Sequence, residues 1–211
     1  MILRSMLTLL AAAALPAMAG ERAVELPSVL YTTFAQQPPP AVLDSLQDEV
    51  EAIMGPIGRH YVWRAIADVK GNEVSSELAV LTFKGGCNAN GLIPKQISPG
   101  ALGWTHVSDG AILPFSEIDC DRIRNFVQKE LLYVKPSERE EVIGRAIGRV
   151  VAHELYHIFA NTPHHGSDGV AKSAYTVQEL LSNDFRFEEA QSKVLRSTVP
   201  PQPVRSGAGA F

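Results

Sequence analysis

The 211-residue chain has only two cysteines and no strong excess of charge of either sign. Its formal net charge is −4, from 19 basic and 23 acidic residues that are spread along the sequence. A protein that binds nucleic acid or an anionic membrane surface needs a basic patch, so neither is expected as a partner. No internal repeat is visible, and the length suits one domain, which we expect to be monomeric.

The sequence also lacks an apolar run of the roughly 20 residues needed to span a bilayer. A shorter apolar stretch, residues 6–16, follows Arg4 and precedes Ala-Met-Ala at 17–19. This order is typical of a cleaved signal peptide, with small residues at the cleavage site. We therefore expect residues 1–19 to be removed after Ala19. The mature protein would be exported, periplasmic or secreted, without stable membrane insertion.

The two cysteines, Cys87 and Cys120, fit an oxidising compartment. Neither belongs to a Cys-x-x-Cys pair, the spacing typical of metal and redox sites. We expect a disulfide between them, and two reduced, buried thiols are the alternative.

Four of the six histidines lie between positions 153 and 165, and residues 153–157 read His-Glu-Leu-Tyr-His. This is the HExxH zinc signature. On a helix, residues four apart share a face, so His153 and His157 can bind one Zn²⁺ while Glu154 reaches a zinc-activated water. The alternative is a surface helix that carries two histidines by chance.

The flanking residues predict such a helix. Ser137 is a candidate N-cap, acidic residues follow it in the first turn, and apolar residues recur at helical spacing up to the motif. Asn161 tolerates left-handed backbone geometry and Pro163 cannot continue a helix. The chain should therefore turn sharply after His157.

A catalytic zinc usually has three protein ligands and one open position, so a third ligand is needed. By spacing, the candidates are His164, His165, Asp168 and Glu179. We favour the two histidines, and His165 slightly over His164.

The segment HELYHIFANTPHHGSDG, residues 153–169, resembles the zincin metallopeptidases, and the histidine soon after the helix resembles their metzincin branch. The metzincin pattern would place glycine at Ala160 and histidine at Pro163, so this chain has a longer turn, with Asn161 replacing the glycine. The segment also resembles exported bacterial zincin-like proteins whose third histidine comes eight residues after the second. That register implies His165, and it places Ala171 where those proteins have methionine.

The expected fold is α+β: a small zincin-like domain with a twisted sheet, a backing helix and the HExxH metal helix, over residues 41–197. Residues 20–40 are expected to be an extended lead-in, with a trimmed propeptide as one hypothesis, and residues 198–211 a disordered tail. Strands are predicted at 59–66 and 76–83, as a hairpin or neighbours, and at 103–108 and 111–118 around Asp109-Gly110. Besides the metal helix, helices are predicted at 41–54, 121–132, 176–183 and 187–196.

The resemblance implies a zinc metallopeptidase, expected to be an endopeptidase, that hydrolyses peptide or protein substrates with Glu154 as general base. In such folds an exposed strand, here Gly103 to Val107, binds the peptide by strand addition. Tyr175, Tyr156 and His106 are candidate oxyanion donors, although each also suits an ordinary packing or polar contact. The alternative function is a catalytically inactive, zinc-stabilised, secreted binding module whose protein ligands fill the coordination sphere.

Overall fold

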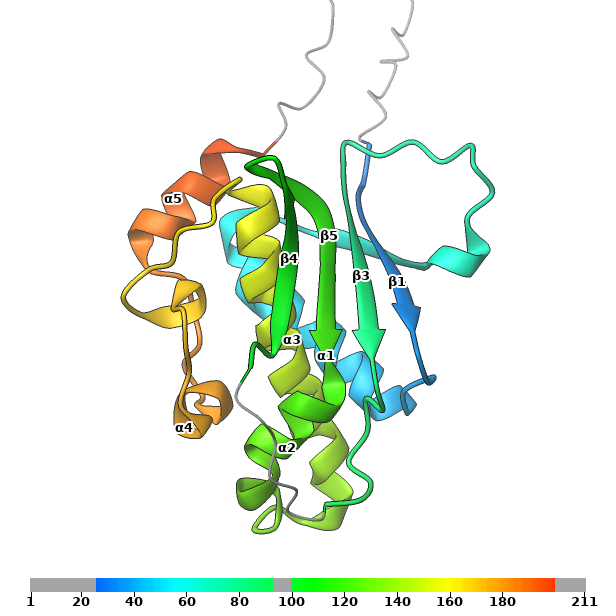
Figure 1. Ribbon diagram of the computed structural model, residues 1–211, viewed down its shortest axis with the longest axis vertical. Helices are drawn as coiled ribbons and strands as arrows, with labels where there is room; N and C mark the ends of the chain where they lie inside the picture. Colours follow the sequence, from blue (N-terminus) through cyan, green and yellow to red (C-terminus); the bar gives the residue numbers. More distant parts are fainter. Residues whose placement is uncertain (1–25, 93–99, 200–211) are drawn as a thin grey trace, which may run out of the picture.

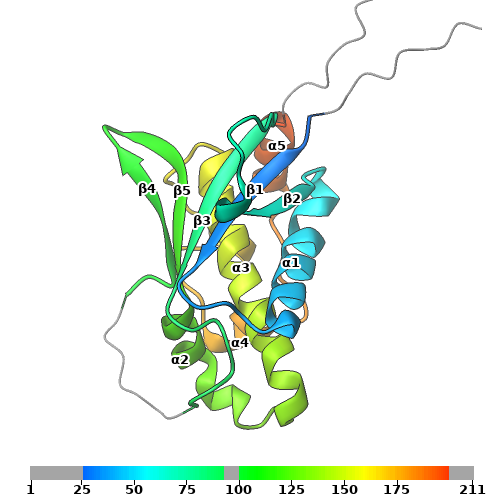
Figure 2. The ribbon, with the colours of Figure 1, turned by 90° about the vertical axis from the view of Figure 1, so that its right-hand side faces the viewer.

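The computed structural model describes residues 26–92 and 100–199 of the chain. The predicted signal peptide, its cleavage site and residues 200–211 of the predicted tail lie outside this range. Five strands form one mixed sheet in the order β2-β1-β3-β5-β4. Helices α1 (Pro40–Met54) and α3 (Arg139–Phe159) lie on one face of the sheet, as the side view shows (Figure 2). The predicted α+β class is confirmed.

Strand β1 (Ser28–Phe34) occupies an inner position and pairs in parallel with both β2 (Tyr61–Ala65) and β3 (Glu77–Lys84). Residues 28–34 of the predicted lead-in, 20–40, form this strand and so belong to the sheet. The prediction that the strands at 59–66 and 76–83 form a hairpin or are neighbours is wrong, because β1 lies between β2 and β3. Figure 1 shows β1 beside β3, and Figure 2 labels β2 on the other side of β1. Strand β1 was not predicted because inner parallel strands carry continuous apolar runs rather than an alternating pattern. Its own apolar run is short and lies just before glutamines and prolines, which indicate a loop.

The antiparallel hairpin was predicted correctly. Strands β4 (Gly103–Ser108) and β5 (Ala111–Asp119) are joined by Asp109 and Gly110, both with positive φ, 50° and 79°. Such φ values match the right-handed twist of the flanking strands. Strand β4 forms one edge of the sheet, and β5 pairs in parallel with β3.

The disulfide between Cys87 and Cys120 is present, and both residues are buried. Cys87 follows strand β3, and Cys120 is the first residue of helix α2 (Cys120–Leu131). The bond therefore fixes the end of the central sheet to the helix that follows β5.

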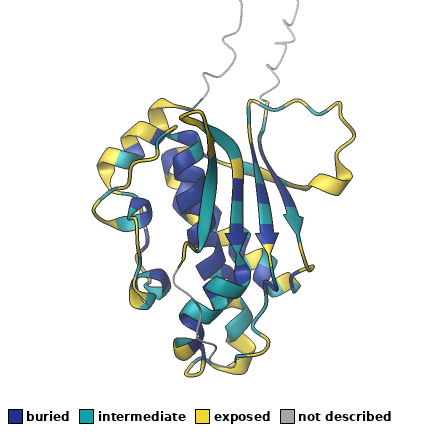
Figure 3. Ribbon diagram, viewed as in Figure 1, coloured by how far each residue is buried: buried dark blue, intermediate teal, exposed yellow. Residues whose placement is uncertain are grey.

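Helix α3 packs closely against α1 because two of its residues are glycines. A Cβ atom at Gly144 would lie 2.4 Å from the Val42 carbonyl oxygen, and one at Gly148 would lie 2.8 Å from that of Leu46. Arg149 adds a nearly buried ion pair with Glu49 of α1, at 2.6 Å. Figure 3 shows that α3 is buried along most of its length.

The start of α3 differs from the prediction, whereas the C-terminal helices lie close to their predicted ranges. Helix α3 begins at Arg139 without a side-chain cap, so Ser137 is not its N-cap; Pro136–Glu138 instead form a short 3₁₀ turn. The two C-terminal helices are α4 (Val177–Leu181) and α5 (Glu189–Ser197), close to the predicted ranges. Over residues 26–92 and 100–199, no helix has both the length and the apolar character needed to cross a membrane.

Candidate metal centre

The last two turns of α3 present His153 and His157 on one side of the helix. Both residues are buried, with 9% and 7% of their surface exposed. Their Nε2 atoms are 3.1 Å apart. The i, i+4 spacing of the motif thus brings two imidazole nitrogens to one point, as the sequence predicted for a helix.

The other nitrogen of each ring is held by a backbone carbonyl. Nδ1 of His153 donates to the Val170 oxygen at 2.8 Å, and Nδ1 of His157 donates to the Thr162 oxygen at 2.7 Å. A carbonyl oxygen can only accept, so in each neutral ring the proton is on Nδ1 and the Nε2 lone pair is free.

The donor set fits a metal cation. Burial lowers the pKa of His153 to about 4 and also lowers the pKa of His157, so both rings are neutral near pH 7. Two lone pairs therefore face each other across 3.1 Å without a proton between them. A cation bound by both nitrogens removes this repulsion, and neutral imidazole is a preferred ligand of Zn²⁺.

His165 is the third member of the cluster. Asn161 adopts the predicted left-handed conformation, φ 47°, and the Thr162 amide donates to the His157 carbonyl at 3.1 Å. The turn brings the His165 ring to 4.8 Å from that of His157, centroid to centroid. Ligand nitrogens of His153, His157 and His165 all lie within 4.8 Å of one another. That these three bind a metal stays a prediction.

The other candidates for the third ligand lie apart from this cluster. Within the described residues, the group of nearby metal-binding side chains does not include His164, Asp168 or Glu179. Glu179 instead caps helix α4 together with Thr176 and pairs with Lys172, whose ammonium group lowers the pKa of Glu179 to about 2.

Glu154 lies beside the histidines with 3% of its surface exposed. Its Oε2 atom accepts a hydrogen bond from the Thr105 hydroxyl of strand β4 at 2.8 Å. Burial raises the pKa of Glu154 to about 7, and the Thr105 hydrogen bond opposes this shift. A cation bound by the histidines would also oppose the effect of burial and lower the pKa of Glu154, because it favours the ionised carboxylate.

The three candidate oxyanion donors make ordinary contacts. The Tyr175 hydroxyl donates to the Val170 carbonyl and lies 2.9 Å from Nδ1 of His153, on the opposite side of that ring from Nε2. Tyr156 packs against the ring of Phe187, and His106 lies 3.1 Å from the carboxylate of Glu117. None of these contacts is made to the Nε2 atoms of His153 and His157.

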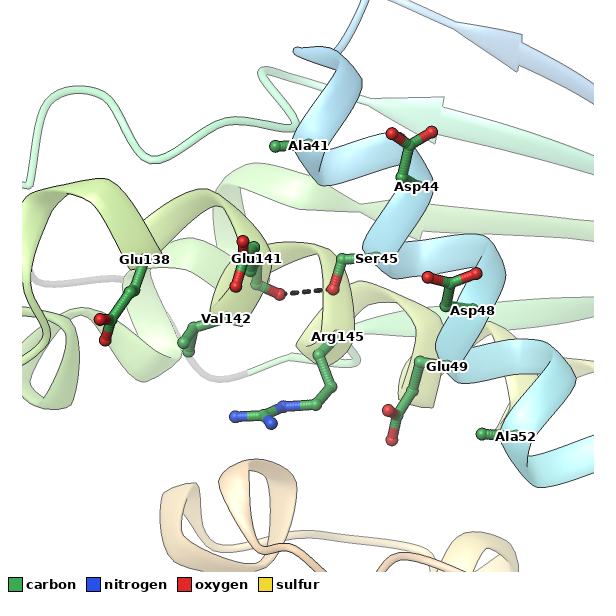
Figure 4. Close-up of a pocket in the computed structure, with 10 residues that line it drawn as sticks. All are labelled: Ala41, Asp44, Ser45, Asp48, Glu49, Ala52, Glu138, Glu141, Val142 and Arg145. Atoms are coloured by element: carbon green, nitrogen blue, oxygen red, sulfur yellow. Dashed lines mark hydrogen bonds between the residues drawn. The ribbon is translucent and has the colours of Figure 1, made fainter.

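Among hollows lined by described residues, one beside α3 includes the motif and another does not. A cavity of about 240 Å³ borders His153 and Glu154; its other lining residues are Gly100, Ala101, Leu102, Gly103, Phe126, Val150, Ser173, Ala174 and Tyr175. A wider groove of about 680 Å³ lies between α1 and the first turns of α3. Figure 4 shows its acidic side chains and the bond from the Ser45 hydroxyl to the Glu141 carbonyl, 2.7 Å long. No residue of the HELYH motif lines that groove.

Sequence reasoning missed the groups that hold the motif in place. The pairing of Thr105 with Ser116 could not be predicted from the Asp109-Gly110 turn, whose register would pair Thr105 with Pro114. A register shift between Thr105 and Val107 moves the pairing to Ser116. The carbonyls of Val170 and Thr162 carry no sequence signal, because every residue has one.

No protein-family model and no curated protein matches this chain in sequence. Among solved structures, the chain is similar to archaemetzincin from Methanopyrus kandleri, with 12% sequence identity and a TM-score of 0.46. The matched region covers 85% of this chain and 98% of the other. At this identity and TM-score, the similarity supports no conclusion about the chemistry of the histidine cluster.

Proposed function

We propose that this protein is an exported zinc peptidase that hydrolyses peptide bonds with Glu154 as its general base. The observation that supports this most strongly is the cluster of His153, His157 and His165 nitrogens within 4.8 Å of one another, next to the Glu154 carboxylate. The three histidines would hold the zinc.

The roles of the residues follow from their chemistry. When bound, zinc would polarise the scissile carbonyl and lower the pKa of the attacking water. Glu154 would accept a proton from that water and pass it to the leaving amine. Nδ1 of His153 and of His157 would keep donating to their carbonyl oxygens, which fixes the ring orientations.

The substrate we propose is an extended peptide or protein segment, bound by the monomer. Strand β4 is at the edge of the sheet and contacts Glu154 through Thr105, so a peptide added to its free edge would run past the base. The cavity beside Glu154 has apolar walls from Leu102, Phe126 and Val150, which suit an apolar substrate side chain.

The number of clustered ligands favours a peptidase over a zinc-stabilised binding module. Such a module would need a fourth protein ligand to close the coordination sphere. In the two described ranges, the cluster comprises three histidines and no further histidine, cysteine or carboxylate. A position for water and substrate is therefore part of the proposal.

Export is supported by chemistry that suits an oxidising compartment. The Cys87–Cys120 disulfide is buried, and such bonds persist outside the cytosol. We propose that the segment at 1–19 is the signal that directs this export.

The test compares mature wild type with Glu154→Gln at equal zinc occupancy, using casein as an unstructured substrate. We expect about one zinc per chain in both proteins by the three-ligand argument. Hydrolysis should fall at least about a hundredfold in the variant, the usual size of a general-base contribution.

Other results would change the conclusion. Bound zinc without any turnover by wild type on broad peptide libraries would favour the binding module. No bound zinc would mean that the HELYH interpretation is wrong.

A further inference from the structure

The carboxylate of Glu154 is held from the sheet rather than from its own helix. Its Oε2 atom accepts from the Thr105 hydroxyl at 2.8 Å, and that hydroxyl lies 2.8 Å from the Ser116 hydroxyl of strand β5. Ser116 is 1% exposed. Two hydroxyl groups thus lie in series between the interior of the sheet and the proposed base.

The direction of these hydrogen bonds follows from the number of protons. The Thr105 hydroxyl donates to Oε2 of Glu154, as it must when the carboxylate is ionised and ready to act as a base. The single hydroxyl proton of Thr105 is then used, and Ser116 must donate to the Thr105 oxygen. Thr105 and Ser116 are directly opposite in the β4–β5 register, beyond the register shift between Thr105 and Val107, so the hairpin places the two hydroxyls side by side.

Strand β4 also limits the space around the carboxylate. A Cβ atom at Gly103 would lie 3.0 Å from Oε1 of Glu154, 3.1 Å from its Cγ and 2.9 Å from Cγ1 of Val150. Gly103 and Thr105, on the same face of β4, therefore confine the carboxylate. Over residues 26–92 and 100–199, the salt bridges do not involve Glu154, and the hydrogen bond to its carboxylate comes from Thr105, so its position depends on a neutral hydroxyl.

We propose that Ser116 and Thr105 are positioning residues that aim the Glu154 carboxylate through the relay Ser116 to Thr105 to Glu154. The proposal rests on the proposed function, in which Glu154 is the base. One oxygen of Glu154 is fixed by Thr105 and the other is left for the water. Because the same strand presents the free edge to the peptide, β4 sets the positions of base and substrate together.

The test uses Thr105→Val, which keeps the β-branched shape but removes the hydroxyl, and Thr105→Ser, which keeps the hydroxyl. Thr82→Val is the matched control: it is the same change on β3, at a position that alternates with the buried Leu81 and Phe83 and so faces away from α3. The double variant Thr105→Val with Ser116→Ala removes both hydroxyls and leaves no orphaned donor.

We expect kcat to fall about tenfold or more in Thr105→Val and in the double variant, since a small displacement of a catalytic group costs that much. KM and zinc content should stay near wild type, and Thr105→Ser should recover most of kcat. Thr82→Val should match wild type in all three. Wild-type kcat in Thr105→Val, or equal losses in the Val and Ser variants, would overturn the proposal.

A structural readout separates this proposal from the proposed function. Crystal structures of zinc-free wild type, Thr105→Val and Thr105→Ser should show Glu154 turned away from β4 only in the Val variant. An unmoved Glu154 in that variant would contradict the relay whatever the activity. If wild type hydrolyses no peptide, the proposed function fails, and the position of Glu154 still decides whether Thr105 aims it.

Discussion

Two of the three clustered histidines belong to a helix and the third to a loop. His153 and His157 are buried on α3, and each has a backbone carbonyl that fixes its ring. His165 is exposed on the turn after the helix, and in the described part of the chain its ring accepts or donates no hydrogen bond. The same residue type is thus placed in two physically different ways.

The difference shows where the free energy of metal binding would be used. The two helical histidines are already held in place, so metal binding costs them little side-chain entropy. Their Nε2 lone pairs face each other across 3.1 Å, and a bound cation would relieve that repulsion. His165 must lose side-chain freedom to bind, and this entropy cost reduces its net contribution. The helical pair should therefore dominate affinity, while His165 completes the coordination.

The largest effect on zinc affinity should come from replacing one helical histidine, and it should exceed the effect of replacing the loop histidine. We expect His157→Ala to weaken zinc binding on the order of a thousandfold, since a few ligands share about 10–16 kcal/mol in zinc sites. His165→Ala should cost about tenfold to a hundredfold, because part of its gain is lost to ordering. Competition with a zinc chelator measures both, and His164→Ala is the matched control with wild-type affinity. Equal losses for His157→Ala and His165→Ala would remove the distinction.

A pH series sharpens the comparison by isolating the contribution of His153, one of the two buried histidines. The folded pKa of His153, about 4, is below the ordinary 6.5, so between these values the unfolded chain binds more protons. Zinc-free protein should thus lose stability as the pH falls from 6.5 to 4, by about 3 kcal/mol from a shift of this size. Urea unfolding across this range measures the slope. If His153→Asn shows the same pH dependence of unfolding free energy as wild type, other titrating groups cause that dependence.

A smaller effect should follow from loosening the helix that carries the pair. Gly144→Ala would place a methyl group 2.4 Å from the Val42 carbonyl oxygen, so α1 and α3 must separate. We expect a loss of about 1–3 kcal/mol in unfolding free energy, as for other overpacked sites. In an open helix the same change stabilises by about 1 kcal/mol, so the sign alone tests the close contact. Thermal or urea denaturation measures it, and a stabilised variant would contradict the packing described.

The sequence predicted the parts of the molecule that local signals determine. The metal helix, the left-handed Asn161, the Asp109-Gly110 hairpin and the Cys87–Cys120 bond each follow from residues close together or from a single possible pairing. Such features depend little on the rest of the fold.

The remainder depends on tertiary structure. The inner position of β1 arises from its partners β2 and β3, which are about 30 and 50 residues away along the chain. His164 and His165 are adjacent in sequence, and only the path of the turn decides which one approaches His157. Ser137 has the chemistry of an N-cap, but the 3₁₀ turn that begins at Pro136 moves the helix start past it.

The inner position of β1 also limits how this protein can mature. Removing Ser28–Phe34 would take away the strand with which β2 pairs in the described part of the chain, and it would expose the edge of β3. Unpaired strand edges invite pairing with other chains, so such a cut would produce an aggregation-prone fragment rather than a trimmed enzyme. Any proteolytic processing that leaves a working protein must therefore occur before Ser28, and an activating segment can include none of the residues that build the sheet.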